Sequence, residues 1–175
     1  MTTDDLRYPI GTFAAVPATP EIRRAAIDDI AALPQRLREA VARLSDAQLD
    51  TPYRPGGWTV RQLVHHVADS HMNGFIRVKL ALTEENPTIK PYDEKTWASL
   101  ADTQLPVGVS LDILDNVHAR WDAVNRGLTP EQFQRTFYHP ELDKSLTLDA
   151  QVQLYAWHSK HHVAHVTGLR QRQGW

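Results

Sequence analysis

The sequence predicts an all-α protein, a four-helix bundle with a long crossover between the second and third helices. Three observations support this class. Four long segments carry the periodicity of amphipathic helices, and each begins at a residue that can cap a helix. A proline-punctuated connection separates the second segment from the third, as in bundles with a crossover. The length of 175 residues suits a single domain over 1–175, and no internal repeats or low-complexity tracts divide it.

The first helix is expected from Pro20 to Leu44. Thr19 can cap its N-terminus, and Pro20 suits the first helical position because its missing N–H would have no partner there. Pro34 lies inside this segment, so we expect it to kink or divide the helix. Residues 51–57 follow as a linker rich in turn-forming side chains.

The second helix is expected to begin after Thr59 and to run to about Thr83. Thr59 and Gln62 have the spacing of a capping box, in which two backbone N–H groups find side-chain acceptors. The connection over residues 84–109 contains three prolines, and a short helical piece is expected around 94–100. Connections of this length inside a small domain are often functional lids or crossovers.

The third helix is expected to start at Ser110, which can serve as its cap, and to end at Gly127. Thr129 can cap a short extra turn directly afterwards.

A small hairpin is expected before the fourth helix, formed by residues 135–138 and 145–148. The fourth helix should begin near Thr147 and continue to about Gln173.

Composition excludes several classes of function. The chain has no cysteine, which rules out disulfides, iron–sulfur clusters, thiolate zinc sites and a cysteine nucleophile. Its formal net charge of -2 gives no electrostatic reason to expect nucleic acid or a membrane as partner. No apolar run reaches the roughly 20 residues that span a bilayer, and the first residues lack a signal-peptide pattern, so we expect a cytoplasmic protein. Motifs of nucleotide-binding proteins, serine hydrolases and zincins are also missing.

Histidine is the unusual residue of this sequence, because seven of the nine histidines fall within residues 65–71 and 158–165. The fourth helix offers two pairs at a spacing of four, His158 with His162 and His161 with His165. Two imidazoles at this spacing can reach one metal ion. A helical wheel places His158 and His162 toward the core and the other pair closer to the rim. The inward pair is therefore the candidate pair of ligands.

A mononuclear catalytic site commonly has three protein ligands and one position for water, so the second helix should supply the third ligand. Its periodicity places His71 in the middle of the core face and His65 on the exposed side. His66 heads a polar row that continues through Ser70, Asn73 and Arg77. Periodicity alone favours His71 as much as His66, and the choice stays open at this point.

Two stretches, residues 56–73 and 155–165, resemble the YfiT-type branch of the DinB superfamily. Four shorter elements match the same family in the same order, namely residues 8–11, 83–85, 91–95 and 137–140. The resemblance therefore covers nearly the whole chain.

This resemblance implies a four-helix bundle with metal-dependent hydrolase activity on a small molecule, in a cytoplasmic homodimer. It also implies the ligands. The first stands eight residues after the tryptophan that opens the second helix, which is His66 counted from Trp58. The other two are the ends of the H-x-x-x-H in the last helix, His158 and His162. One divalent ion per subunit is expected, zinc or alternatively nickel. Because cysteine is absent, such an ion must be bound by imidazole, carboxylate and water.

Other members of the superfamily are thiol S-transferases that use bacillithiol, mycothiol or glutathione. The alternative function is therefore metal-dependent transfer of a low-molecular-weight thiol to an electrophile. A third alternative, from a different class, is a non-enzymatic binding protein that the metal stabilises.

Few other residues are candidates for chemistry. Asp69 lies one turn from His66 and is the catalytic candidate, as a general base or as the partner of a ligand imidazole; a plain surface carboxylate is as good an interpretation. Residues 92–94 of the crossover could line the mouth of the site, and a structural or solvated role is an equal alternative for them. His139 could approach the metal from the hairpin.

Overall fold

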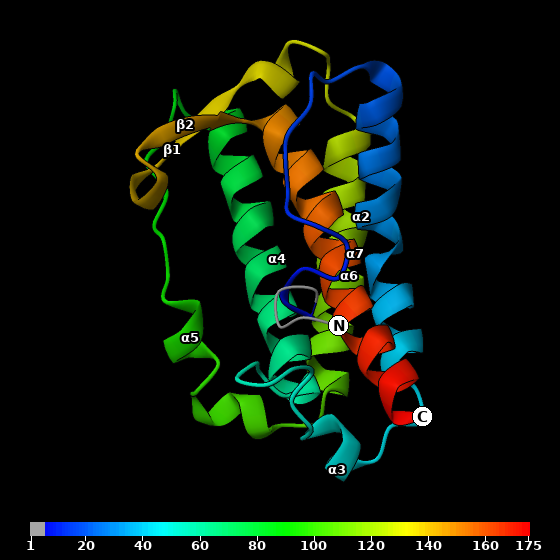
Figure 1. The fold of residues 1–175 in the computed structure, drawn as a ribbon. Coiled ribbons are helices and arrows are strands. Elements are labelled where there is room, and N and C mark those ends of the chain that lie inside the picture. The colour runs from blue at the N-terminus through cyan, green and yellow to red at the C-terminus, as the bar shows by residue number, and fades with distance from the viewer. Residues whose placement is uncertain (1–5) are drawn as a thin grey trace.

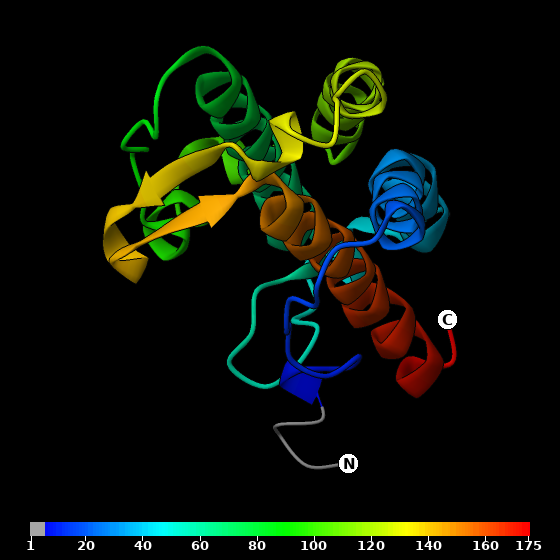
Figure 2. The same cartoon turned by 90° about the horizontal axis from the view of Figure 1, so that it is seen from above.

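The computed structural model describes residues 6–175 and shows four long helices, α2 (Pro20–Val41), α4 (Val60–Thr83), α6 (Gly108–Arg126) and α7 (Leu148–Gln173) (Figure 1). Around the bundle each helix packs against two neighbours, in the order α2, α6, α4, α7 (Figure 2). In Figure 1, α4 and α6 run upward, whereas α2 and α7 run downward. The predicted four-helix bundle is confirmed.

The crossover between α4 and α6 is long because these two helices run in the same direction, so the chain must return along the bundle. It carries α5 (Glu94–Trp97) and the 3₁₀ turn η1 (Ala101–Gln104). Its first part is fastened to the hairpin, since the backbone N–H of Ile89 donates to the carbonyl of Tyr138 at 3.1 Å. The crossover therefore closes over α4 on the side of the hairpin.

The remaining elements lie at the ends of the bundle. The hairpin is confirmed: its strands pair antiparallel, with Thr136 opposite Thr147. The capped turn at Thr129 is also present, as a 3₁₀ turn. The elements are α3 (Asp46–Leu49), η2 (Gln132–Gln134), β1 (Thr136–His139), η3 (Pro140–Leu142) and β2 (Lys144–Thr147).

The predicted caps set the starts of three long helices. The hydroxyl of Thr19 accepts from the backbone N–H of Ile22 at 3.3 Å, and that of Thr147 from Ala150 at 3.1 Å. Thr59 and Gln62 form the full capping box. Such caps stabilise a helix by about 1 kcal/mol each and involve residues within one turn. The starts of these helices could therefore be predicted from the sequence.

The interpretation of Pro34 needs correction in one respect: the proline does not divide α2, which continues through it and ends at Val41 rather than at Leu44. A proline inside a helix leaves the carbonyl four residues earlier without its usual N–H partner. That carbonyl belongs to Ile30, and Nδ1 of His118 on α6 lies 2.8 Å from it. A side chain of a neighbouring helix therefore supplies the missing hydrogen bond.

Two expectations about the start of α6 and the outer side of α4 were wrong, for one shared reason. Ser110 does not cap α6, which begins at Gly108, and His65 is buried rather than exposed. Oγ of Ser110 lies 2.7 Å from Nδ1 of His65, and the carbonyl of Leu105 lies 3.0 Å from Nε2. The end of the crossover and the first turn of α6 thus cover this face of α4.

The core consists of two apolar clusters, one toward each end of the bundle. One contains Leu33 and Leu114, and the other contains Ile30 and Trp121. Buried histidines of α4, α6 and α7 lie at the level between them. Among the described residues, no helix is both long enough and apolar enough to cross a lipid bilayer.

Candidate metal centre and its pocket

Three histidines from two neighbouring helices meet in the middle of the bundle. His66 comes from α4, and His158 and His162 come from successive turns of α7. One ring nitrogen of each lies within 4.8 Å of one from both others. The ring centroids are 5.6 Å apart for His66 and His158, 5.1 Å for His66 and His162, and 4.4 Å for the α7 pair. The structure thus brings together the three residues that the family resemblance named.

Burial keeps these three imidazoles neutral. It lowers the pKa of His66 to about 4, and it lowers the pKa values of His158 and His162 well below the ordinary range. A neutral imidazole carries the lone pair that a metal ion requires.

The donor set fits a metal ion in a further respect. Nε2 of His158 and Nε2 of His162 are 3.1 Å apart, so the two lone-pair positions converge. Nδ1 of His162 is buried and has no hydrogen-bond partner among residues 6–175. Three converging nitrogen donors suit zinc, nickel and related divalent ions.

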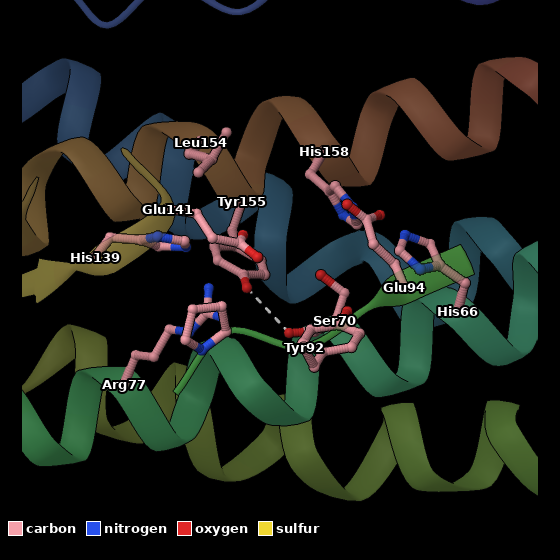
Figure 3. A pocket seen from close by; sticks show the side chains of 11 residues that line it. His66, Ser70, Arg77, Tyr92, Glu94, His139, Glu141, Leu154, Tyr155 and His158 are labelled. Atoms are coloured by element: carbon pink, nitrogen blue, oxygen red, sulfur yellow. Dashed lines mark hydrogen bonds between the residues drawn. The ribbon is translucent and has the colours of Figure 1, made fainter. Parts of the chain in front are cut away.

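A cavity of about 200 Å³ opens beside His66 and His158, between α4 and α7 (Figure 3). The crossover and the hairpin close its outer side. Its remaining lining residues come from α4, the crossover, the hairpin and α7, and are Ser70, Arg77, Pro91, Tyr92, Glu94, His139, Glu141, Leu154 and Tyr155.

The crossover contributes a carboxylate and a phenol to this pocket. In Figure 3 the carboxylate of Glu94 lies over the ring of His158 in projection, and Glu94 lines the same pocket as His66 and His158. Burial, followed by the charge of Glu141, raises the pKa of Glu94. Burial likewise raises the pKa of Tyr92, so its hydroxyl keeps its proton. Of the three crossover candidates only Asp93 is not in the lining; it caps α5 by accepting from the N–H of Thr96 at 3.0 Å.

The end of the pocket away from the metal ligands is formed by Arg77, His139 and Glu141. Nδ1 of His139 is buried without a hydrogen-bond partner in the described chain. Burial and the nearby Arg77 cation lower the pKa of His139. Glu141 was missed at the sequence level, although its position beside His139 in the hairpin loop was a usable signal.

Asp69 does not line the pocket. It is half-buried on α4, where burial and the charge of Asp102 raise its pKa to about 6. His71, the other residue that periodicity favoured, is fully buried behind the ligands, with Nε2 3.1 Å from Nδ1 of His158. It therefore contacts the side of His158 opposite His162.

The second α7 pair is also buried, which corrects the expectation that it lies near the rim. The N-terminal segment packs over it, with the rings of Tyr8 and His161 6.1 Å apart. Nε2 of His165 lies 3.2 Å from the carbonyl of Arg7, and its ring stacks on Tyr53 at 4.1 Å. A wheel drawn for α7 alone could not anticipate this cover.

With this geometry established, comparison with known proteins identifies the family. The sequence profile of the DinB superfamily matches residues 29–166. The chain belongs to the DinB superfamily.

Two curated relatives and one solved structure match this DinB-superfamily protein almost end to end. A Bacillus mycoides (strain KBAB4) protein, named as an inferred metal-dependent hydrolase, is 55% identical over 98% of this chain and 99% of its own. A Bacillus cereus (strain ZK / E33L) protein with the same description is 54% identical over the same shares. The structure of YfiT from Bacillus subtilis superposes with a TM-score of 0.95 at 50% identity, covering 98% of this chain and 99% of YfiT.

YfiT is described as an inferred metal-dependent hydrolase with an unusual four-helix bundle topology. The present chain shares that fold, and its histidine groups can hold a metal ion. Metal dependence is thus supported by the relatives' names and by the geometry together.

Proposed function

We propose that this protein is a metal-dependent hydrolase of a small molecule, with His66, His158 and His162 as the ligands of one zinc or nickel ion. The observation that carries the proposal is the opening of the histidine triad onto a pocket with a carboxylate. His66 and His158 belong to both the triad and the pocket, and Glu94 lines the same pocket. A cavity of about 200 Å³ limits the substrate group that reaches the ligands to a small one.

When bound, the divalent ion supplies Lewis-acid chemistry at the open side of the triad. Glu94 accepts a proton from the attacking nucleophile and returns it to the leaving group. Burial raises the pKa of Glu94, which makes its carboxylate a stronger proton acceptor than an exposed one. Asp69 lies outside the pocket lining and is therefore not the proton acceptor in this proposal.

The remaining pocket residues bind and orient the substrate. Arg77 and Nδ1 of His139, which has no hydrogen-bond partner among residues 6–175, present polar groups at the end away from the triad. The hydroxyl of Tyr155 donates to the backbone carbonyl of Ser70 at 3.0 Å, which holds its ring as a rigid wall between the two ends. A substrate with a polar group at one end and a hydrolysable bond at the other fits this arrangement.

The test compares zinc-loaded wild type with His66→Asn and Glu94→Gln on a panel of small aryl esters, amides and phosphates. We expect His66→Asn to lose zinc and hydrolysis together. Glu94→Gln should keep zinc but lose roughly 100-fold or more in kcat, the contribution typical of a general base. Asp69→Asn is the matched control and should keep most of the activity.

Adding thiols and chlorinated aromatic electrophiles to the same proteins distinguishes the alternatives. Thiol-dependent conjugation without thiol-independent hydrolysis would replace the proposal by S-transfer. Zinc-dependent stability without either activity would favour a binding protein.

A further inference from the structure

We propose that His118 and His71 are positioning residues that fix the tautomer of His158, so that its Nε2 lone pair points into the histidine triad. This inference deepens the proposed function and rests on its metal ligands. It is carried by three consecutive side-chain contacts that cross the bundle from α2 to α7.

The chain of contacts starts at a backbone carbonyl that Pro34 leaves free. Because Pro34 has no N–H, the carbonyl of Ile30 lacks its helical partner. Nδ1 of His118 lies 2.8 Å from this oxygen. A carbonyl oxygen can only accept, so Nδ1 of His118 must carry the proton and donate. In a neutral ring, Nε2 of His118 is then a lone pair.

Each following contact is determined by the one before it. Nε2 of His118 is 3.0 Å from Nδ1 of His71, which must therefore donate to it. This leaves Nε2 of His71 as an acceptor, 3.1 Å from Nδ1 of His158. His158 in turn donates from Nδ1, and its own Nε2 is left as a lone pair.

The free nitrogen at the end of the chain is the one that faces the triad. Nε2 of His158 lies 3.1 Å from Nε2 of His162, beside His66. Metal-ligating histidines characteristically donate their second N–H to a partner that fixes ring and tautomer. In this protein the partner is another histidine, and the ultimate acceptor is the Ile30 carbonyl.

Burial makes the reversed arrangement costly. His118 and His71 are 2% and 0% exposed, and they stack with ring centroids 4.9 Å apart. Reversing one ring would set two N–H groups or two lone pairs against each other at its contacts. A buried polar group that loses its hydrogen-bond partner is strongly disfavoured, because it has already given up its hydrogen bonds to water. This series of hydrogen bonds from His158 through His71 and His118 to the Ile30 carbonyl, here called the relay, therefore has one favourable direction.

The first test needs no metal and uses a variant only to assign signals. Nitrogen-15 NMR of histidine-labelled, chelator-treated wild type distinguishes the Nδ1–H from the Nε2–H tautomer of a neutral imidazole. The His158 signals are identified by their loss in His158→Gln. We expect the Nδ1–H tautomer for His118, His71 and His158. The Nε2–H tautomer at His158 would overturn the proposal, whatever the protein hydrolyses.

The second test asks whether the relay supports metal binding. Gln at position 71 can offer an acceptor to Nδ1 of His158, whereas Leu cannot. Loss of such a partner typically costs 10- to 100-fold in metal affinity. We therefore expect zinc affinity to fall by that factor in His71→Leu and to stay near wild type in His71→Gln, with circular dichroism confirming both folds. Equal affinities in two folded variants would contradict the relay's role, while zinc binding by wild type would leave the proposed centre intact.

Discussion

Helix α7 carries two histidine pairs with identical spacing and different surroundings. His158 and His162 face α4, where His66 completes a triad and the pocket begins. His161 and His165 are both buried, but there the N-terminal segment covers them, through Tyr8 and the carbonyl of Arg7. The spacing of four on one helix therefore allows two histidines to share a metal ion. The element that packs against them determines whether a third ligand and a pocket are also present.

The partners of the two pairs differ at one residue. Nδ1 of His158 has a histidine donor–acceptor chain behind it, whereas Nδ1 of His162, of His161 and of His165 has no hydrogen-bond partner within the described part of the chain. A ligand that is oriented from behind binds a metal ion better than one that is not. We expect this contrast to appear directly in experiments on the two pairs.

Metal content should show the largest difference between the pairs. His158→Ala removes a ligand of the triad, so purified protein should lose nearly all its zinc. His161→Ala leaves the triad intact and should keep the wild-type amount. Elemental analysis of both variants measures this. Because His161, His162 and His165 also lie within 4.8 Å of one another, loss of zinc from His161→Ala alone would place the ion on the outer side of α7.

His118, behind the triad, and His161, on the outer side of α7, should each reduce the stability of the protein in acid by a similar amount. The reason is that burial lowers the pKa of both residues to about 4. Unfolded histidine titrates near 6.5, so the unfolded state binds more protons between about pH 6.5 and pH 4. The free energy of unfolding of the metal-free protein should therefore fall on acidification through this window. Each such group contributes up to about 1.4 kcal/mol per pH unit.

Urea unfolding at several pH values, with His118→Asn and His161→Asn, measures these contributions. Each variant should flatten the pH dependence of the unfolding free energy. An unchanged slope in His161→Asn would mean that the N-terminal cover leaves the outer pair hydrated in solution.

Alanine substitutions at two glycines should give the smallest effects on stability, and they compare the pocket wall with the outer side of α7 by the same chemical change. A Cβ at Gly74 on α4 would lie 2.7 Å from the Tyr155 hydroxyl, inside the wall of the pocket. A Cβ at Gly168 on the outer side of α7 would meet only the flexible end of Arg172, at 3.3 Å. We expect Gly74→Ala to destabilise by about 1–3 kcal/mol through overpacking, and Gly168→Ala to stabilise by up to about 1 kcal/mol through helix propensity. Thermal unfolding of both variants tests this; equal effects would show that the pocket wall can shift freely.

Much of this organisation could be predicted locally. The capping box at Thr59 and the cap at Thr147 set the starts of α4 and α7, because these hydrogen bonds form within one turn. The inward direction of His158 and His162 followed from the period of α7. Signals of this kind depend only on residues close in sequence, so the sequence expresses them directly.

Other features depended on elements that pack from elsewhere. Periodicity described His65 as exposed, yet the end of the crossover buries it, and it could not separate His66 from His71. Pro34 suggested a kink or a break in the first helix. His118 of another helix instead supplies a hydrogen bond to the Ile30 carbonyl, which Pro34 leaves without its helical N–H partner. A helical wheel gives a side chain's direction relative to its own axis and contains no information on the neighbour that meets it.

The sequence alone thus determined the helices, their caps and the metal-ligand spacing, all of which are local properties of the backbone. The family resemblance named His66. Only the tertiary structure decided which nitrogen atoms converge, which carboxylate lines the pocket beside them and which histidine stands behind His158. The physical reason is that these relations join segments far apart in the chain, such as His71 and His158 with a separation of 87 residues, and packing alone brings such segments together.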